Sequence, residues 1–187
     1  MPVRPWTQLG VSAGAGHLAY ELLNGAAVPL ATLGAGRVVA GYGAGTAGLC
    51  WAASKTPLER GGRGFSVTNG LLLSAVIGHF TSWPRTTHTG LPWLTECEGL
   101  SGRAMPAYNA LLYASAVFAV GGLAEHRRHW QWGAVVPVLA VPLLRYATPR
   151  HYQQLLRQAA GHPRWWNRRL TAISREQTPD AVSSSTT

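Results

Sequence analysis

The chain has 187 residues, of which 12% are charged and 47% hydrophobic, and its formal net charge is +9. Soluble domains usually contain about a quarter charged residues, so this composition argues against an ordinary soluble domain. The positive charge comes from arginines between apolar runs, with Lys55 the single lysine, which favours contact with lipid headgroups over nucleic acid. The two cysteines, Cys50 and Cys97, are too few for a disulfide framework or a cysteine-based metal site.

Stretches without Lys, Arg, Asp or Glu define most of the predicted elements. A membrane-spanning helix needs roughly 20 mainly apolar residues. The sequence has five candidate segments, at about residues 11–31, 34–53, 65–83, 104–124 and 130–146. In the second, Gly41 and Gly45 form a GxxxG pair, which lets helix backbones approach closely in lipid. We therefore predict an all-α fold, a polytopic membrane bundle of about five transmembrane helices within residues 1–146.

The segments outside these helices support the same map. Residues 147–176 are basic and aromatic, and we expect an amphipathic tail that lies on the membrane surface. Residues 177–187 are expected to be disordered. Arginines fall on both predicted sides of the membrane, so the orientation stays open. Five tryptophans lie at predicted helix ends, where interfacial aromatic residues belong: Trp51, Trp83, Trp93, Trp130 and Trp132.

Glu21 is the most informative residue of the sequence. It lies in the middle of the first predicted span, where an unpaired carboxylate is costly. His17, four residues earlier, and Asn24, three residues later, share its helix face, and Tyr20 is adjacent. One interpretation is a buried acid, oriented by His17 and Asn24, that donates a proton to a lipophilic substrate. The alternative is a hydrogen-bonding clamp between helices that carries no chemistry.

Two further groups are candidates for the same site. Glu96 and Glu98, in the connection before the fourth helix, either face the cavity of the first carboxylate or lie in a solvated loop. Tyr108, Asn109 and Tyr113 form a polar and aromatic face on the fourth helix, which either lines a substrate cavity or only packs against its neighbours.

Other polar residues give weaker signals. Asn69, Ser74 and His79 are scattered along the third predicted helix. His126 and His129 are too few for the histidine boxes of membrane di-iron enzymes. We therefore predict neither a metal site nor a cofactor.

The segment HLAYELLNGAAVP, residues 17–29, resembles the first acidic motif of the integral-membrane terpene cyclases of meroterpenoid and indole-diterpene pathways. The motif has an aromatic residue before the glutamate and a proline eight residues after it, here Tyr20, Glu21 and Pro29. The segment LLRYATP, residues 143–149, is similar to a late Leu-Arg-aromatic segment of that family. The His-x-x-x-Glu element also resembles one in the sterol isomerase group, whose chemistry is likewise alkene protonation.

The chain departs from the cyclase pattern in two ways. The cyclases are longer, and they carry a second catalytic acid in their last span. This chain has no acidic residue between Glu125 and Glu176. The second role would therefore fall to Glu96, Glu98 or Glu125, or to nothing.

The resemblance and the residues together predict a membrane enzyme that protonates an isoprenoid-type substrate, with Glu21 as the donor. Its partners would be a lipophilic small molecule and the lipid bilayer, with no nucleic acid. The alternative is a non-catalytic subunit or assembly factor of a larger membrane complex. Protein partners would be further copies of the chain in a homo-oligomer or the other members of such a complex. An enzyme requires an internal cavity of roughly a few hundred Å³ near Glu21, whereas a packing subunit should be filled.

Overall fold

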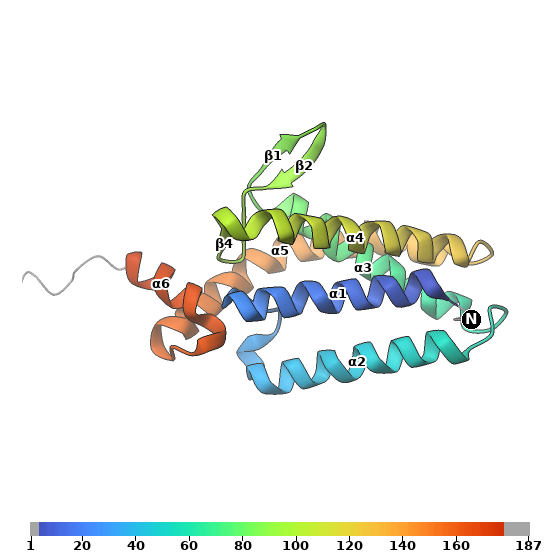
Figure 1. Cartoon of the computed structure of the whole chain (residues 1–187), viewed down its shortest axis with the longest axis horizontal. Coiled ribbons are helices and arrows are strands. Elements are labelled where there is room, and N and C mark those ends of the chain that lie inside the picture. Colours follow the sequence, from blue (N-terminus) through green and yellow to red (C-terminus); the bar gives the residue numbers. More distant parts are fainter. Residues whose placement is uncertain (1–3, 178–187) are drawn as a thin grey trace, which may run out of the picture.

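The computed structural model describes residues 4–177. Six helices account for most of these residues, which confirms the all-α prediction. α1, α2 and α4 lie alongside one another in Figure 1, and α3 and α5 lie behind them. The helices are α1 (Pro5–Asn24), α2 (Ala35–Lys55), α3 (Gly62–Ser82), α4 (Met105–Glu125), α5 (Trp130–Gly161) and α6 (Arg168–Glu176). Short 3-10 turns are η1 (Ala31–Leu33), η2 (Gly102–Ala104) and η3 (Trp165–Asn167).

The membrane part of the prediction finds less support. Within residues 4–177, only the segment Gly102–Glu125, which contains α4, is long and apolar enough to cross a membrane by length and composition. One such helix is weak evidence, because the core helix of a soluble protein passes the same test. A bundle of five membrane spans is therefore not supported by this criterion.

The first helix begins and ends earlier than its apolar run suggested. Pro5 occupies its first turn, where the missing N–H costs nothing, and Gly25 ends it in the left-handed conformation. The first turn is capped from the other end of the chain. Glu125, the last residue of α4, accepts the backbone N–H groups of Trp6 at 2.7 Å and Thr7 at 3.1 Å. This carboxylate ties α1 to α4 and also complements the helix dipole.

The predicted end of the fifth helix at residue 146 is wrong. α5 continues to Gly161 and contains Pro137, Pro142 and Pro149. Residues 147–176 are therefore part of the folded body, because α6 turns back onto the end of α5. Leu155, Leu156 and Ala159 pack with Leu170 and with the segment that follows α1. Of the predicted disordered tail, residues 178–187 lie outside the described part of the chain.

The connection between α3 and α4 forms two small hairpins. β1 (Arg85–His88) pairs with β2 (Leu91–Leu94) in a hairpin that projects from the bundle in Figure 1. β3 (Glu96–Cys97) pairs with β4 (Leu100–Ser101), and this second hairpin is packed inward. Leu94, Cys97 and Leu100 are fully buried in a core cluster with Tyr108 and Leu112 of α4. The connection thus closes one end of the bundle.

α3 and α5 approach each other at two glycines. A side-chain carbon added at Gly70 would overlap the Gly133 carbonyl, and one added at Gly133 would overlap the Ser66 carbonyl. In contrast, Gly41 and Gly45 of the GxxxG pair on α2 have no neighbour within 4 Å of such a carbon. The close helix crossing in this chain therefore lies between α3 and α5, and the GxxxG face of α2 contacts no other helix.

Substituting these glycines with alanine should have opposite consequences. Gly133→Ala forces two backbones apart, and overpacking of this kind costs about 1–3 kcal/mol. Gly43→Ala, where an added side-chain carbon would meet no atom within 4 Å, gains about 1 kcal/mol of helix propensity instead. Thermal unfolding of the purified variants should show a lower melting temperature for Gly133→Ala and no decrease for Gly43→Ala. A wild-type melting temperature for Gly133→Ala would contradict the described crossing.

Candidate functional site

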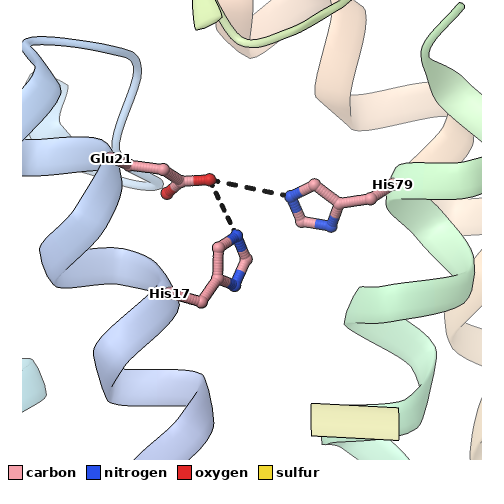
Figure 2. Close-up of side chains that lie close together, drawn as sticks. All are labelled: His17, Glu21 and His79. Carbon is pink, nitrogen blue, oxygen red and sulfur yellow. Dashed lines mark hydrogen bonds and ion pairs between the residues drawn. The ribbon is translucent and has the colours of Figure 1, made fainter. Parts of the chain in front are cut away.

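Three helices bring titratable side chains together around Glu21. Its carboxylate is completely buried, and its Oε1 atom lies 2.8 Å from Nε2 of His17 and 3.8 Å from Nε2 of His79 (Figure 2). The i, i+4 spacing on α1 places His17 one turn before Glu21. His79 lies on α3, and its side chain points toward α1.

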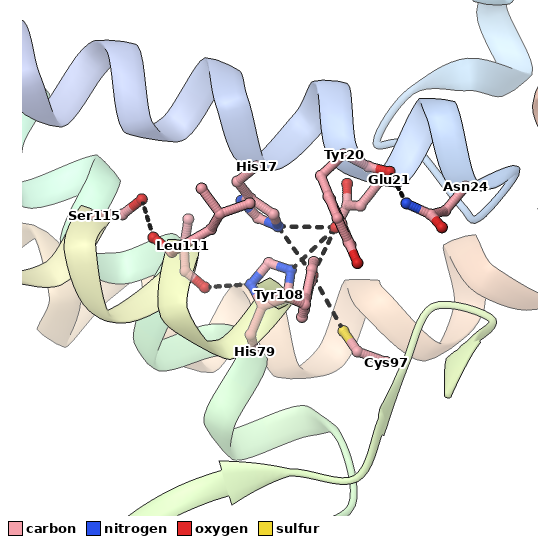
Figure 3. A network of polar contacts seen from close by, with 10 residues as sticks. His17, Tyr20, Glu21, Asn24, His79, Cys97, Tyr108, Leu111 and Ser115 are labelled. Atoms are coloured by element: carbon pink, nitrogen blue, oxygen red, sulfur yellow. Dashed lines mark hydrogen bonds and ion pairs between the residues drawn. The ribbon is translucent and has the colours of Figure 1, made fainter. Parts of the chain in front are cut away.

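α4 completes the cluster with Tyr108, which is also completely buried. Its hydroxyl donates to Oε1 of Glu21 at 2.6 Å and lies 2.9 Å from Nε2 of His17. The thiol of Cys97, from the inward hairpin, lies 3.4 Å from the same hydroxyl (Figure 3). One buried carboxylate therefore connects α1, α3, α4 and the second hairpin.

A second carboxyl group, Glu98, reaches this cluster from the turn between β3 and β4. Glu98 and Gly99 have φ values of 51° and 91°, as a two-residue type I′ turn requires. The Glu98 carbonyl accepts the Ala27 N–H at 2.9 Å, which ties the turn to the segment after α1. Only 9% of the residue is exposed. Burial, followed by repulsion from the Glu21 carboxylate, raises the pKa of Glu98 well above its usual value.

Three buried polar atoms of the cluster have no hydrogen-bond partner among the described residues: Oε2 of Glu21, Oε2 of Glu98 and Nε2 of His79. Nδ1 of His79 lies 2.6 Å from the Ala75 carbonyl, which can only accept a hydrogen bond. This contact assigns the Nδ1 proton and leaves Nε2 directed toward Glu21. Unpaired buried polar atoms are costly in folded proteins, so three in one cluster mark these side chains as the candidate site.

Apolar cavities meet the cluster from two sides. A cavity of about 420 Å³ between α1, α2 and α3 is lined by His17 and His79 together with leucine, alanine and glycine residues. Another, of about 260 Å³, is lined by His79 and Glu98 with Trp83 and Leu144. His79 therefore faces both cavities, and Glu98 faces the second. Glu21 lies behind these side chains.

Only some of the site residues predicted from the sequence lie in the cluster around Glu21. Glu96 is exposed, and only Glu98 of that pair joins the cluster. Asn24 donates to the Tyr20 carbonyl at 2.9 Å, so it does not orient Glu21 as expected. The Tyr20 hydroxyl donates to the Ala104 carbonyl at 2.9 Å, and its ring lies 6.3 Å from the Tyr108 ring.

The other two predicted site residues of α4 form hydrogen bonds with the backbone of β2. Asn109 exchanges hydrogen bonds with the backbone N–H and carbonyl of Leu94, and Tyr113 donates to the Pro92 carbonyl. His79 and Cys97 were missed as site residues. For His79 the available signal was one basic side chain inside an otherwise uncharged run, and for Cys97 there was no signal in the sequence.

The two tyrosines of α4 provide a matched test of this network. Tyr108→Phe removes a buried donor to Glu21 and should lower the free energy of unfolding by about 1–3 kcal/mol. Tyr113→Phe removes a hydroxyl near the surface and should change stability by less than about 0.5 kcal/mol. Thermal or denaturant unfolding compares the variants, and equal stability of the two would rule out the described role of Tyr108.

Comparison with known proteins gives no family assignment: no protein-family model, curated protein or solved structure matches the chain.

Proposed function

We propose that this chain is a multi-pass membrane enzyme that transfers protons to a lipophilic, isoprenoid-type substrate, in the manner of a terpene cyclase or isomerase. The observation that carries the proposal is a carboxyl group with a raised pKa, Glu98, which lines an apolar cavity beside His79. The first-motif resemblance around Glu21 points to the same chemistry.

The distribution of polar and apolar side chains supports a membrane location. Glu21, Asn69 and Asn109 are completely buried, whereas Leu139 and Val138 on α5 are 71% and 69% exposed. Water favours the opposite arrangement, but lipid accepts apolar side chains outside and polar ones inside. Such an exposed apolar surface would otherwise promote association.

The tryptophans support the same location. α1 and α3 run in one direction along the bundle and α2 and α4 in the other (Figure 1). At one end lie Trp6, Trp51, Trp130 and Trp132, and at the other lie Trp83, Trp93, Trp165 and Trp166. All eight tryptophans of the sequence are therefore near the two ends, as expected for aromatic belts at membrane interfaces.

The geometry favours Glu98 over Glu21 as the proton donor. Glu98 contacts a cavity, and burial raises its pKa, which favours the proton-bearing form, whereas Glu21 is engaged by His17 and Tyr108. A proton transferred from Glu98 to a double bond leaves a carboxylate on the enzyme and a carbocation on the substrate. The carboxylate then accepts a proton from a neighbouring carbon, which regenerates the acid and completes an isomerisation or cyclisation. Nearby aromatic faces, including Trp83, can stabilise the cation.

A non-catalytic subunit is the second candidate, and one observation favours it. α2 contacts mainly α1 and η1, and most of its residues are exposed. Its open glycine face would fit a helix of another chain. The cavities at His79 nevertheless favour the enzyme, because a packing subunit has no need for them.

The membrane location predicts how the protein behaves on extraction. The chain should remain in the membrane fraction after washing with high salt or alkaline carbonate, because its apolar surface rather than its charge holds it there. Detergent should release it. Complete recovery in a detergent-free soluble fraction would contradict the membrane location.

The reaction is tested by replacing each glutamate with glutamine. Glu98→Gln keeps the size of the side chain but removes the proton, so turnover should fall by at least about 100-fold. Glu96→Gln, two residues away and exposed, is the matched control and should retain wild-type turnover. Farnesyl and geranylgeranyl substrates with a terminal alkene or epoxide would be supplied in D₂O, and mass spectrometry would detect products carrying deuterium on carbon. A fully active Glu98→Gln variant would exclude this donor and favour the subunit alternative.

A further inference from the structure

The side chains His17, Glu21 and His79 offer three metal-ligand atoms within one small volume. Their ligand atoms all lie within 4.8 Å of one another, and all three residues are largely buried. The Nε2 atoms of both imidazoles face the same carboxylate oxygen, at 2.8 and 3.8 Å (Figure 2). Ligands of a tetrahedral zinc ion lie about 2.0–2.2 Å from the metal. An ion between these atoms therefore needs only small side-chain adjustments.

The surrounding contacts are those of a prepared ligand set. The Ala75 carbonyl accepts a hydrogen bond from Nδ1–H of His79, which leaves the lone pair of Nε2 available to bind a metal ion. Tyr108 donates to the Glu21 carboxylate and orients it. Both Nε2 of His79 and Oε2 of Glu21 lack a hydrogen-bond partner among residues 4–177, although both are buried. A cation between the two imidazoles and Oε1 of Glu21 would give the unpaired Nε2 of His79 a partner.

We propose that His17, Glu21 and His79 bind one divalent transition-metal ion, of which Zn²⁺ is the representative. Two imidazoles and one carboxylate suit first-row metals such as zinc or iron rather than calcium or magnesium, which prefer oxygen ligands. Three protein ligands also leave a coordination position open, as in catalytic rather than structural zinc sites. Because His17 and His79 both line the cavity of about 420 Å³, the open position faces that cavity.

A second set of possible ligands, His79, Cys97 and Glu98, shares its imidazole with the first. We assign the ion to the first set because the Cys97 thiol already contacts Tyr108 at 3.4 Å. Glu98 then lies outside the ligand set, close to Glu21, and a divalent ion there would lower the pKa of Glu98 rather than keep the proton on it. Its proposed role in proton transfer therefore refers to the metal-free protein. The metal site itself does not depend on the reaction.

The test is metal binding by the purified, chelator-treated full chain in detergent, without an affinity tag of histidines. Co²⁺ is the probe, because its visible absorption reports the coordination geometry, and Zn²⁺ should displace it. The wild type should bind about one equivalent of Co²⁺ with the intense bands of a four-coordinate site, and Zn²⁺ should raise the melting temperature. His79→Gln and Glu21→Gln should each weaken binding by at least about 10-fold, while circular dichroism confirms that they are folded.

Three control variants separate the assignment from its alternatives. His88→Gln, on the exposed β1 strand, should bind as the wild type does, so a loss there would indicate surface binding. Cys97→Ser and Glu98→Gln should also retain the ion, and a loss in either would overturn the ligand set. An inactive Glu98→Gln variant that still binds Co²⁺ separates the two proposals. Wild-type protein that binds no Co²⁺ and shows no stabilisation by Zn²⁺ would refute the metal site and leave the proton-transfer proposal standing.

Discussion

The buried carboxylate of Glu21 is the constraint on which the rest of this structure depends. A carboxylate removed from solvent needs hydrogen-bond donors or positive charge close by. Here His17 and Tyr108 meet that need, and His79 faces the same oxygen. Because the partners come from α1, α3 and α4, the requirement sets how these helices face one another. The inward hairpin follows, since Cys97 and Glu98 must pack against the same group. The need of one buried carboxylate for hydrogen-bond partners thus determines how the helices of a mainly apolar bundle are arranged.

The opposite end of the bundle is closed by contacts of the same kind. Glu125 caps the first turn of α1, and the guanidinium group of Arg4 donates to the Pro57 and Arg60 carbonyls at 2.8 and 2.6 Å. Between the two ends α3 and α5 approach closely through small residues, as at Gly133. Many large apolar residues, such as Leu139 and Val138, are exposed. This arrangement satisfies polar groups internally and exposes leucine and valine side chains, which is the physical basis of the proposal that the chain lies in lipid.

The sequence predicted local features well and contacts between elements poorly. The uncharged runs located four of the five long helices, and the i, i+4 spacing predicted the contact of His17 with Glu21, because both depend only on nearby residues. The end of α5 was predicted too early because the uncharged run stops at Arg145, whereas the helix continues through the basic residues that follow. Which helix face meets which could not be predicted, since apolar residues surround each helix almost evenly, and His79 therefore had no visible partner. The choice of Glu98 over Glu96 had one local signal, the Gly99 that follows it and permits the tight turn.

The central claim is that a neutral carboxylic acid, Glu98, faces an apolar cavity beside the Glu21 cluster. Infrared spectroscopy tests this most directly, because the carbonyl stretch of a protonated carboxyl group is separate from the bands of carboxylates and amides. In chelator-treated protein at neutral pH, the wild type and the Glu96→Gln variant should both show this band, since burial and Glu21 raise the pKa of Glu98. The band should disappear in Glu98→Gln. A wild-type spectrum without the band, or the same band in the Glu98→Gln variant, would contradict the account.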